Sequence, residues 1–244
     1  NGISSRRFAA WMDQNNMNTI NDLMEMGFIH PKNNREILLH PMIREVAVEE
    51  LKPSVRNCLV LLDSLQEISL MHGLEFMNNK QVFHTVESII ATIRKDDIPR
   101  YLLFLENVFQ YMDKYHYEAG MQAIIEEMTM ILSDDSVGTS ADRACLLDVR
   151  AVLEKNTNKQ IALVEEAILV LGEVHSGNAH LAANLHANLG ALYHKAGRMD
   201  FAKLYMEQGV QLLEEYNLTG YHDSVTQICN YAALITDLGE PQRA

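Results

Sequence analysis

The sequence NLGALYHKAG at residues 188–197, together with Ala202 after it, decides the fold of this 244-residue chain. Its apolar residues recur at helical spacing, and Gly197 stands where helices commonly end in a left-handed residue. Small residues recur at Gly190, Ala202 and Gly209. Because small side chains leave room where helices cross, this spacing predicts a hairpin of two closely packed helices.

The same stretch resembles a tetratricopeptide (TPR) repeat. The spacing Leu189-Gly190-x-x-Tyr193, then Gly197, then Ala202 matches most signature positions of that family. The resemblance implies an all-α fold, a right-handed α-solenoid of helical hairpins in which each hairpin contacts mainly its neighbours. Leu189 and Tyr193 are then expected to fill the space between successive hairpins.

The pattern recurs at a long period. The sequence NYAAL at residues 230–234 begins 42 residues after Asn188, and Gly239 takes the place of Gly197. This offset exceeds the roughly 34 residues of the commonest TPR unit, so longer helices or links are expected. Kinesin light chains and bacterial signalling proteins carry enlarged repeats of this kind. We assign residues 52–244 to four or five hairpins, the last of them truncated. Breaks between helices are predicted near residues 72–73, 96–99, 134–138, 156–158, 176–178, 197 and 219–220.

The first fifty residues follow a different pattern. A helix around residues 18–26 is expected to end at Gly27, and two β-prone runs at 28–29 and 37–39 flank a turn-rich segment, which predicts a β-hairpin. Pro41 suits the first turn of another helix. The predicted buried stripe of that helix consists of Ile43, Val46, Ala47 and Leu51.

This N-terminal region resembles the end of the winged-helix segment of NB-ARC proteins of the STAND class. The resemblance rests on LMEMGFI at residues 23–29 and LHPMIREVA at residues 39–47. It implies a winged-helix-like remnant over residues 1–51 and makes the chain the C-terminal, ligand-sensing part of a bacterial signalling ATPase or transcriptional regulator. The chain contains no G-x-x-x-x-G-K-[ST] loop, so we expect no ATP hydrolysis by this piece.

Composition narrows the range of partners and compartments. The formal charge of −13 disfavours direct nucleic-acid binding. No apolar run approaches the ~20 residues of a membrane span. Three widely spaced cysteines, Cys58, Cys145 and Cys229, indicate no disulfide framework and favour a cytoplasmic protein in which they pack as small hydrophobes. The chain lacks an initiator Met, so we expect it to be a piece of a longer protein.

No catalytic, cofactor-binding or metal-binding motif stands out. The ten histidines include no H-E-x-x-H motif. His30 and His40 flank the predicted hairpin and could approach each other, but they have no carboxylate or cysteine partner in register, so we expect them to cap or pack. His180, His186 and His194 share a helix without all facing one side. We therefore predict a protein that is not an enzyme and that needs no cofactor and no metal.

The predicted binding site lies on the first helix of each repeat. Asn188 and Asn230 occupy matching positions that face the concave groove in TPR proteins, and Asn184 and Lys195 are expected on the same face. An amide both donates and accepts hydrogen bonds, so it can bind the backbone of an extended peptide. The alternative is that these asparagines only satisfy neighbouring groups or face water.

Two hypotheses of function remain. In the first, the chain is a protein- or peptide-binding module in a signal-transduction protein. In the second, it is a scaffold that forms a homodimer through its terminal repeat, where Tyr231, Leu234 and Ile235 are expected to lack a covering helix.

Overall fold

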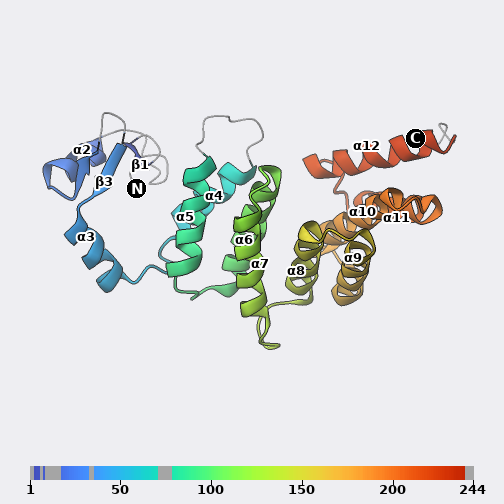
Figure 1. Cartoon of the computed structure of the whole chain (residues 1–244), viewed down its shortest axis with the longest axis horizontal. Coiled ribbons are helices and arrows are strands. Elements are labelled where there is room, and N and C mark those ends of the chain that lie inside the picture. Colours follow the sequence, from blue (N-terminus) through green and yellow to red (C-terminus); the bar gives the residue numbers. More distant parts are fainter. Residues whose placement is uncertain (1–2, 6–7, 9–17, 33–35, 71–78, 240–244) are drawn as a thin grey trace. The chain divides into compact units, whose positions relative to one another are not determined.

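The computed structural model describes residues 3–5, 8, 18–32, 36–70 and 79–239 (Figure 1). Helices make up 73% of the structure, and the described residues contain eleven α-helices with one small sheet. The predicted predominance of helix is therefore confirmed. The chain divides into two compact units, an N-terminal unit of residues 1–124 and a C-terminal unit of residues 125–244.

The N-terminal unit begins with a small antiparallel sheet. Its strands β1 (Ile3–Ser4), β2 (Ile29–Pro31) and β3 (Glu36–Leu39) are ordered β1-β3-β2, and Ile29 pairs with Leu39. The predicted pairing of the two β-prone runs is confirmed, while β1 adds a strand that the sequence did not indicate. The tip of the predicted hairpin, at residues 33–35, lies outside the described residues.

Helix α2 (Asn18–Glu25) lies between β1 and β2 in the chain and ends as predicted. Gly27 has φ +73°, the Gly27 amide donates to the Met24 carbonyl, and the Phe28 amide donates to the Leu23 carbonyl. These two bonds form a Schellman cap, which satisfies carbonyls at the helix end. A small core of Ile20, Ile29 and Ile37 joins α2 to the sheet.

The next helical segment corrects a prediction. Pro41 does begin α3 (Pro41–Val46), but the last residues form a π-helical turn, η1 (Ala47–Leu51). The predicted buried stripe is wrong: Val46 and Leu51 are 55% and 69% exposed, and Ile43 and Ala47 are only partly covered. No described element packs extensively on this segment, so its apolar side chains remain largely exposed.

Longer helices complete the N-terminal unit. They are α4 (Leu59–Leu70), α5 (Asn79–Thr92), α6 (Ile98–Lys114) and the first half of α7 (Glu118–Leu132). The predicted break at 96–99 is confirmed, since the Asp97 side chain accepts a hydrogen bond from the Arg100 amide and caps α6. The predicted break at 72–73 lies outside the described residues.

The helices that follow α7 in the C-terminal unit each pack on the next one. After α7 come α8 (Ser140–Leu153), α9 (Thr157–Leu171), α10 (Ala179–Lys195), α11 (Met199–Glu215) and α12 (His222–Asp237) (Figure 1). The breaks predicted in this part of the chain all fall in or next to its connections. Gly197 has φ +74°, as its role at the end of α10 requires.

Helices α10 and α11 cross where the sequence predicted. A Cβ atom added at Gly190 would lie 3.0 Å from the Met206 backbone nitrogen and 3.1 Å from the Ala202 carbonyl oxygen. At Gly209 it would lie 3.1 Å from the Ala183 carbonyl oxygen. The glycines are therefore required for the close approach of the two backbones, and Ala202 between them is fully buried.

One apolar core runs through α8 to α12. It contains Leu189, Tyr193 and Met206 and extends to Leu234 on α12. The prediction that Tyr231, Leu234 and Ile235 lack a cover is therefore wrong. Leu234 and Ile235 are 4% and 0% exposed and Tyr231 is partly buried, because α12 packs against α11.

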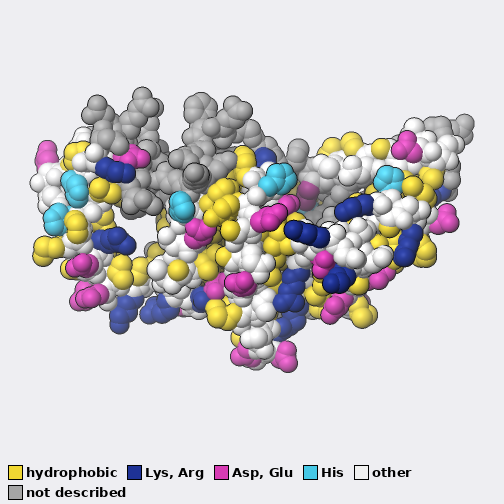
Figure 2. Space-filling model, in the orientation of Figure 1, with side chains coloured by type: hydrophobic (Ala, Val, Ile, Leu, Met, Phe, Trp, Pro, Cys, Tyr) yellow, Lys and Arg dark blue, Asp and Glu magenta, His cyan; other side chains and the backbone are white. Residues whose placement is uncertain are grey.

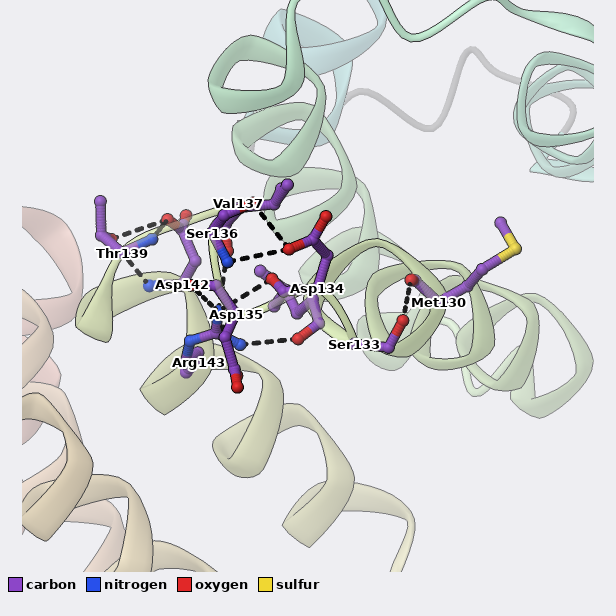
Figure 3. Close-up of polar contacts among 10 residues, drawn as sticks. Met130, Ser133, Asp134, Asp135, Ser136, Val137, Thr139, Asp142 and Arg143 are labelled. Atoms are coloured by element: carbon purple, nitrogen blue, oxygen red, sulfur yellow. Dashed lines mark hydrogen bonds and ion pairs between the residues drawn. The ribbon is translucent and has the colours of Figure 1, made fainter.

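Arg143 orders the connection between α7 and α8 (Figure 3). Its guanidinium group donates to the carbonyl oxygens of Leu132 (2.6 Å) and Val137 (2.9 Å), and to those of Asp134 and Asp135 (both 3.2 Å). A planar guanidinium has five donors, so a single side chain can satisfy several carbonyls of one turn. The start of α8 is thereby fixed to the end of α7.

Tyrosine–glutamate pairs link successive hairpins in both units. The Tyr117 hydroxyl donates to Glu87 of α5 at 2.5 Å, and the Tyr193 hydroxyl of α10 donates to Glu165 of α9 at 2.5 Å. The Glu87 hydrogen bond raises the pKa of Tyr117, and burial with the Glu165 bond raises the pKa of Tyr193 to about 12. Both hydroxyls therefore remain protonated donors at neutral pH.

Candidate partner-binding surface

Four polar side chains connect the helices α8, α10 and α12, which alternate along the chain with α9 and α11. We call Asp148 of α8, Asn184 and Asn188 of α10, and Gln227 of α12 the polar row. Asn188 Nδ2 donates to Asp148 Oδ1 and Oδ2 at 3.1 and 3.3 Å. Gln227 Nε2 donates to Asn184 Oδ1. The row therefore joins α8 to α10 and α10 to α12.

Helical spacing explains how α10 forms hydrogen bonds with both α8 and α12. Asn184 and Asn188 are four residues apart, so their side chains lie one turn apart on the same face of α10. The close crossing of α10 and α11, at Gly190 of α10 and Gly209 of α11, determines how that face is oriented. The same small residues that decide the fold thus position the two asparagines.

Asp148 is the one ionisable residue of the row. Its side chain is only partly exposed, and burial raises the pKa of this carboxyl to about 6, although the hydrogen bond from Asn188 acts to lower it. Desolvation has this effect because it disfavours the ionised form of a carboxyl group.

The four residues predicted from the sequence occupy two kinds of position. Asn184 is partly buried and Asn188 is exposed, and both belong to the polar row. Lys195 is exposed at the end of α10, where its Nζ lies 3.4 Å from Gln160 Oε1. Asn230 is an exposed residue of α12, three positions after Gln227. The structure brings Asn184 and Asn188 together, whereas Lys195 contacts the second helix of the preceding hairpin.

Sequence reasoning missed Asp148 and Gln227, although the repeat period holds a signal for both. A step of 42 residues from Asn184 reaches Thr226, and Gln227 is the next residue. Asp148 precedes Asn188 by 40 residues, two fewer than the period found downstream. A search that allowed the period to vary by two residues would have found both.

A second polar link joins α10 to α12. His180 Nε2 lies 2.9 Å from Asp223 Oδ2, and the His180 ring lies 5.3 Å from the Tyr221 ring. His186 instead lies 5.8 Å from the ring of Tyr205 on α11, and burial lowers its pKa. These histidines therefore contact different helices, as their spacing predicted.

The other groups considered in the sequence are placed as follows. The His30 and His40 ring centroids lie 6.1 Å apart in an edge-on arrangement, so the two rings pack against each other. Cys145 is buried as predicted, but Cys58, in the turn before α4, is partly exposed, and Cys229 of α12 is exposed. Among the residues that the structure describes, no group of three or more His, Cys, Asp or Glu side chains is placed to hold a metal ion.

The described part of the chain contains no helix that is both long and apolar enough to cross a membrane.

On the face of the C-terminal unit seen in Figure 2, acidic and basic side chains are interspersed with hydrophobic ones. That face therefore carries no extended patch of one charge.

Comparisons of this chain with protein-family models, with curated proteins and with solved structures found no match.

Proposed function

We propose that the chain is a non-enzymatic module that binds a protein or peptide through the first helices of a TPR-like right-handed α-solenoid. The observation that carries this proposal is the polar row, which extends over three successive first helices and includes an exposed amide at Asn188. The close α10–α11 crossing and the tyrosine–glutamate links support the repeat architecture.

The chemistry of the row suits an extended peptide. Asn188 uses its Nδ2 group to hold Asp148, which leaves its carbonyl oxygen to accept a backbone N–H from a ligand. Asn230 on α12 presents a second exposed amide. Two amides on neighbouring helices can bind a peptide backbone without selecting its sequence.

We further propose that the chain is the ligand-sensing arm of a cytoplasmic NB-ARC/STAND-type signalling or transcription-regulating protein. The order of α2, the β2–β3 pair and α3 agrees with the end of a winged helix over residues 1–51. In this proposal residues 52–244 form the repeat array, and the nucleotide switch lies elsewhere in the parent protein. Direct contact with nucleic acid or membrane is not part of the proposed function.

A binding selection with a mapped footprint tests the module. Random decapeptides are selected on the folded chain, and the recovered peptides are then used in hydrogen-exchange measurements. We expect protection in α8, α10 and α12 and loss of binding in an Asn188→Ala, Asn230→Ala double variant. Asn158→Ala, which removes an exposed amide from α9, is the matched control and should bind normally. Recovery of no peptide, or equal binding by the double variant, would refute the proposal.

Self-association through the terminal repeat is the second candidate function. The observation that favours it is a set of exposed apolar side chains on or beside α12, although these are not the residues predicted from the sequence. They are Tyr221, Val225 and Leu238, which are 57%, 50% and 37% exposed. A homodimer is a common way to cover such side chains.

Sedimentation velocity over a hundredfold range of protein concentration distinguishes the two functions. A dimer that is weakened by Val225→Ser, but not by Leu169→Ser on α9, would support assembly through α12. Leu169 is a suitable control because it is 80% exposed on a different helix. A monomer at every concentration would rule this function out.

A further inference from the structure

Asp148 is a carboxylate held by a neutral partner. Its hydrogen bonds come from Asn188 Nδ2, which reaches both carboxylate oxygens. Two cationic side chains of the same unit are engaged elsewhere, since Arg150 donates to Thr129 Oγ1 at 2.8 Å and Lys195 lies against Gln160. A carboxylate offers about four acceptor positions, so the amide leaves part of its capacity unused.

This arrangement is unfavourable for the unbound chain. A carboxylate withdrawn from water without a counter-charge loses solvation that a neutral amide only partly replaces. The raised pKa of Asp148 reflects this loss, and burial is its largest cause. A cation brought by a ligand would restore the missing interaction, so binding such a group would relieve an existing penalty.

The neighbouring amide supplies the second half of a recognition site. Asn188 is exposed, and its carbonyl oxygen is not used in the bonds to Asp148. A peptide that donates a backbone N–H to this oxygen would lie within a few ångströms of the carboxylate. The formal charge of −13 also favours the approach of a basic ligand over an acidic one.

We propose that Asp148 and Asn188 together select a basic side chain, arginine or lysine, at one position of the bound peptide. This inference rests on the proposed function and gives it a ligand class: an extended basic peptide whose backbone contacts Asn188 and whose cationic side chain pairs with Asp148.

The test compares peptide selections on two forms of the full chain. Random decapeptides with acetylated and amidated ends are selected in parallel on the native chain and on Asp148→Asn, which keeps the shape of the side chain and removes its charge. The leading peptides are resynthesised with citrulline, a neutral analogue, in place of arginine, or with norleucine in place of lysine. Asp200→Asn, an exposed charge removal on α11, is the matched control.

The native chain and the Asp200→Asn control should enrich arginine or lysine at one position, and the neutral analogue should bind them about 10- to 100-fold more weakly. For Asp148→Asn we expect the enrichment to disappear and the charged and neutral peptides to bind within about twofold of each other. Peptides that bind the first helices with no preference for a cation would overturn this inference while leaving the proposed function intact. Recovery of no peptide by any form would overturn both.

Discussion

The α10–α11 hairpin and the α3–η1 segment both carry apolar residues at helical spacing, yet only the hairpin buries them. In the hairpin Leu189 and Ala202 are fully buried, whereas Val46 and Leu51 in the α3–η1 segment are more than half exposed. The hairpin differs in its small residues. Gly190 and Gly209 allow a second backbone to approach, while the α3–η1 segment has no glycine.

Apolar periodicity therefore predicts a helix more reliably than it predicts what covers the helix. A helix buries its apolar side chains only when another element packs against it. The sequence indicates such a packing partner only where small residues mark a helix crossing. If this explanation is correct, the two regions should respond very differently to substitution.

Gly190→Val is expected to cause a large loss of stability. Already a Cβ atom at this position would lie 2.5 Å from Met206 Cγ and in tight contact with the Met206 and Ala202 backbone, and valine adds two methyl groups to it. Overpacking of this kind costs about 3 kcal/mol, and the strain should appear as faster hydrogen exchange in α10 and α11. Ala191→Val, one position further along α10 and exposed, is the control and should change exchange little. Equal effects of the two substitutions would show that the crossing does not depend on Gly190.

Hydrogen bonds from a side chain can also hold one helix to the next. Arg143→Met measures how much the Arg143 hydrogen bonds contribute to stability. The variant loses the hydrogen bonds to four carbonyls of the α7–α8 connection but keeps most of the side-chain volume. We expect a loss of about 2 kcal/mol, because part of the group faces water and solvent replaces some of the lost bonds. Urea unfolding followed by exchange at the start of α8 measures this loss. Arg143→Lys should recover less than half of it, since an ammonium cannot reproduce the planar fork. Full recovery would mean that charge alone holds the turn.

The same contrast explains what the sequence could reveal of the fold and the site. Helix ends at Gly27, Pro41 and Gly197 were predictable because each depends on the backbone preference of one residue. The exposure of Val46 and the burial of Ile235 were not, because each depends on which other element packs against the helix. For the candidate site, Asn188 was found from its register in the repeat. Asp148 was missed because its helix follows a period two residues shorter.

Asp148→Asn is expected to change the free energy of unfolding by less than Gly190→Val and Arg143→Met, and to stabilise the chain where they destabilise it. The native Asp148 binds its proton more tightly than an unfolded chain does, since its pKa is about 6 rather than 3.8. Protonation therefore favours the folded state, and the native chain should lose stability relative to the variant as pH rises from about 4 to 6. Partial exposure reduces the full effect of the shift, so we expect the variant to be more stable by about 1–2 kcal/mol at pH 7 and equal at pH 4.

Urea unfolding of both forms, read by pulse-labelling exchange of the α8 amides at the two pH values, measures this difference. Asp200→Asn should show no comparable pH-dependent gain. A constant difference from pH 4 to pH 7 would contradict the assignment of an unfavourable charge to Asp148.

The smallest change in stability is expected in the α3–η1 segment, whose apolar side chains have no packing partner. Val46→Gln replaces a side chain that is 55% exposed on α3, so the unfolded and folded states should lose similar apolar contacts. We expect a change within about 0.5 kcal/mol, as for an ordinary surface substitution, in contrast to about 2–5 kcal/mol for Leu189→Ala in the core. Exchange rates in α3 and α2 measure the first change and those in α10 the second. A loss above about 1.5 kcal/mol for Val46→Gln would show that another surface covers α3, and the difference between the two regions would then lie in their partners and not in their small residues.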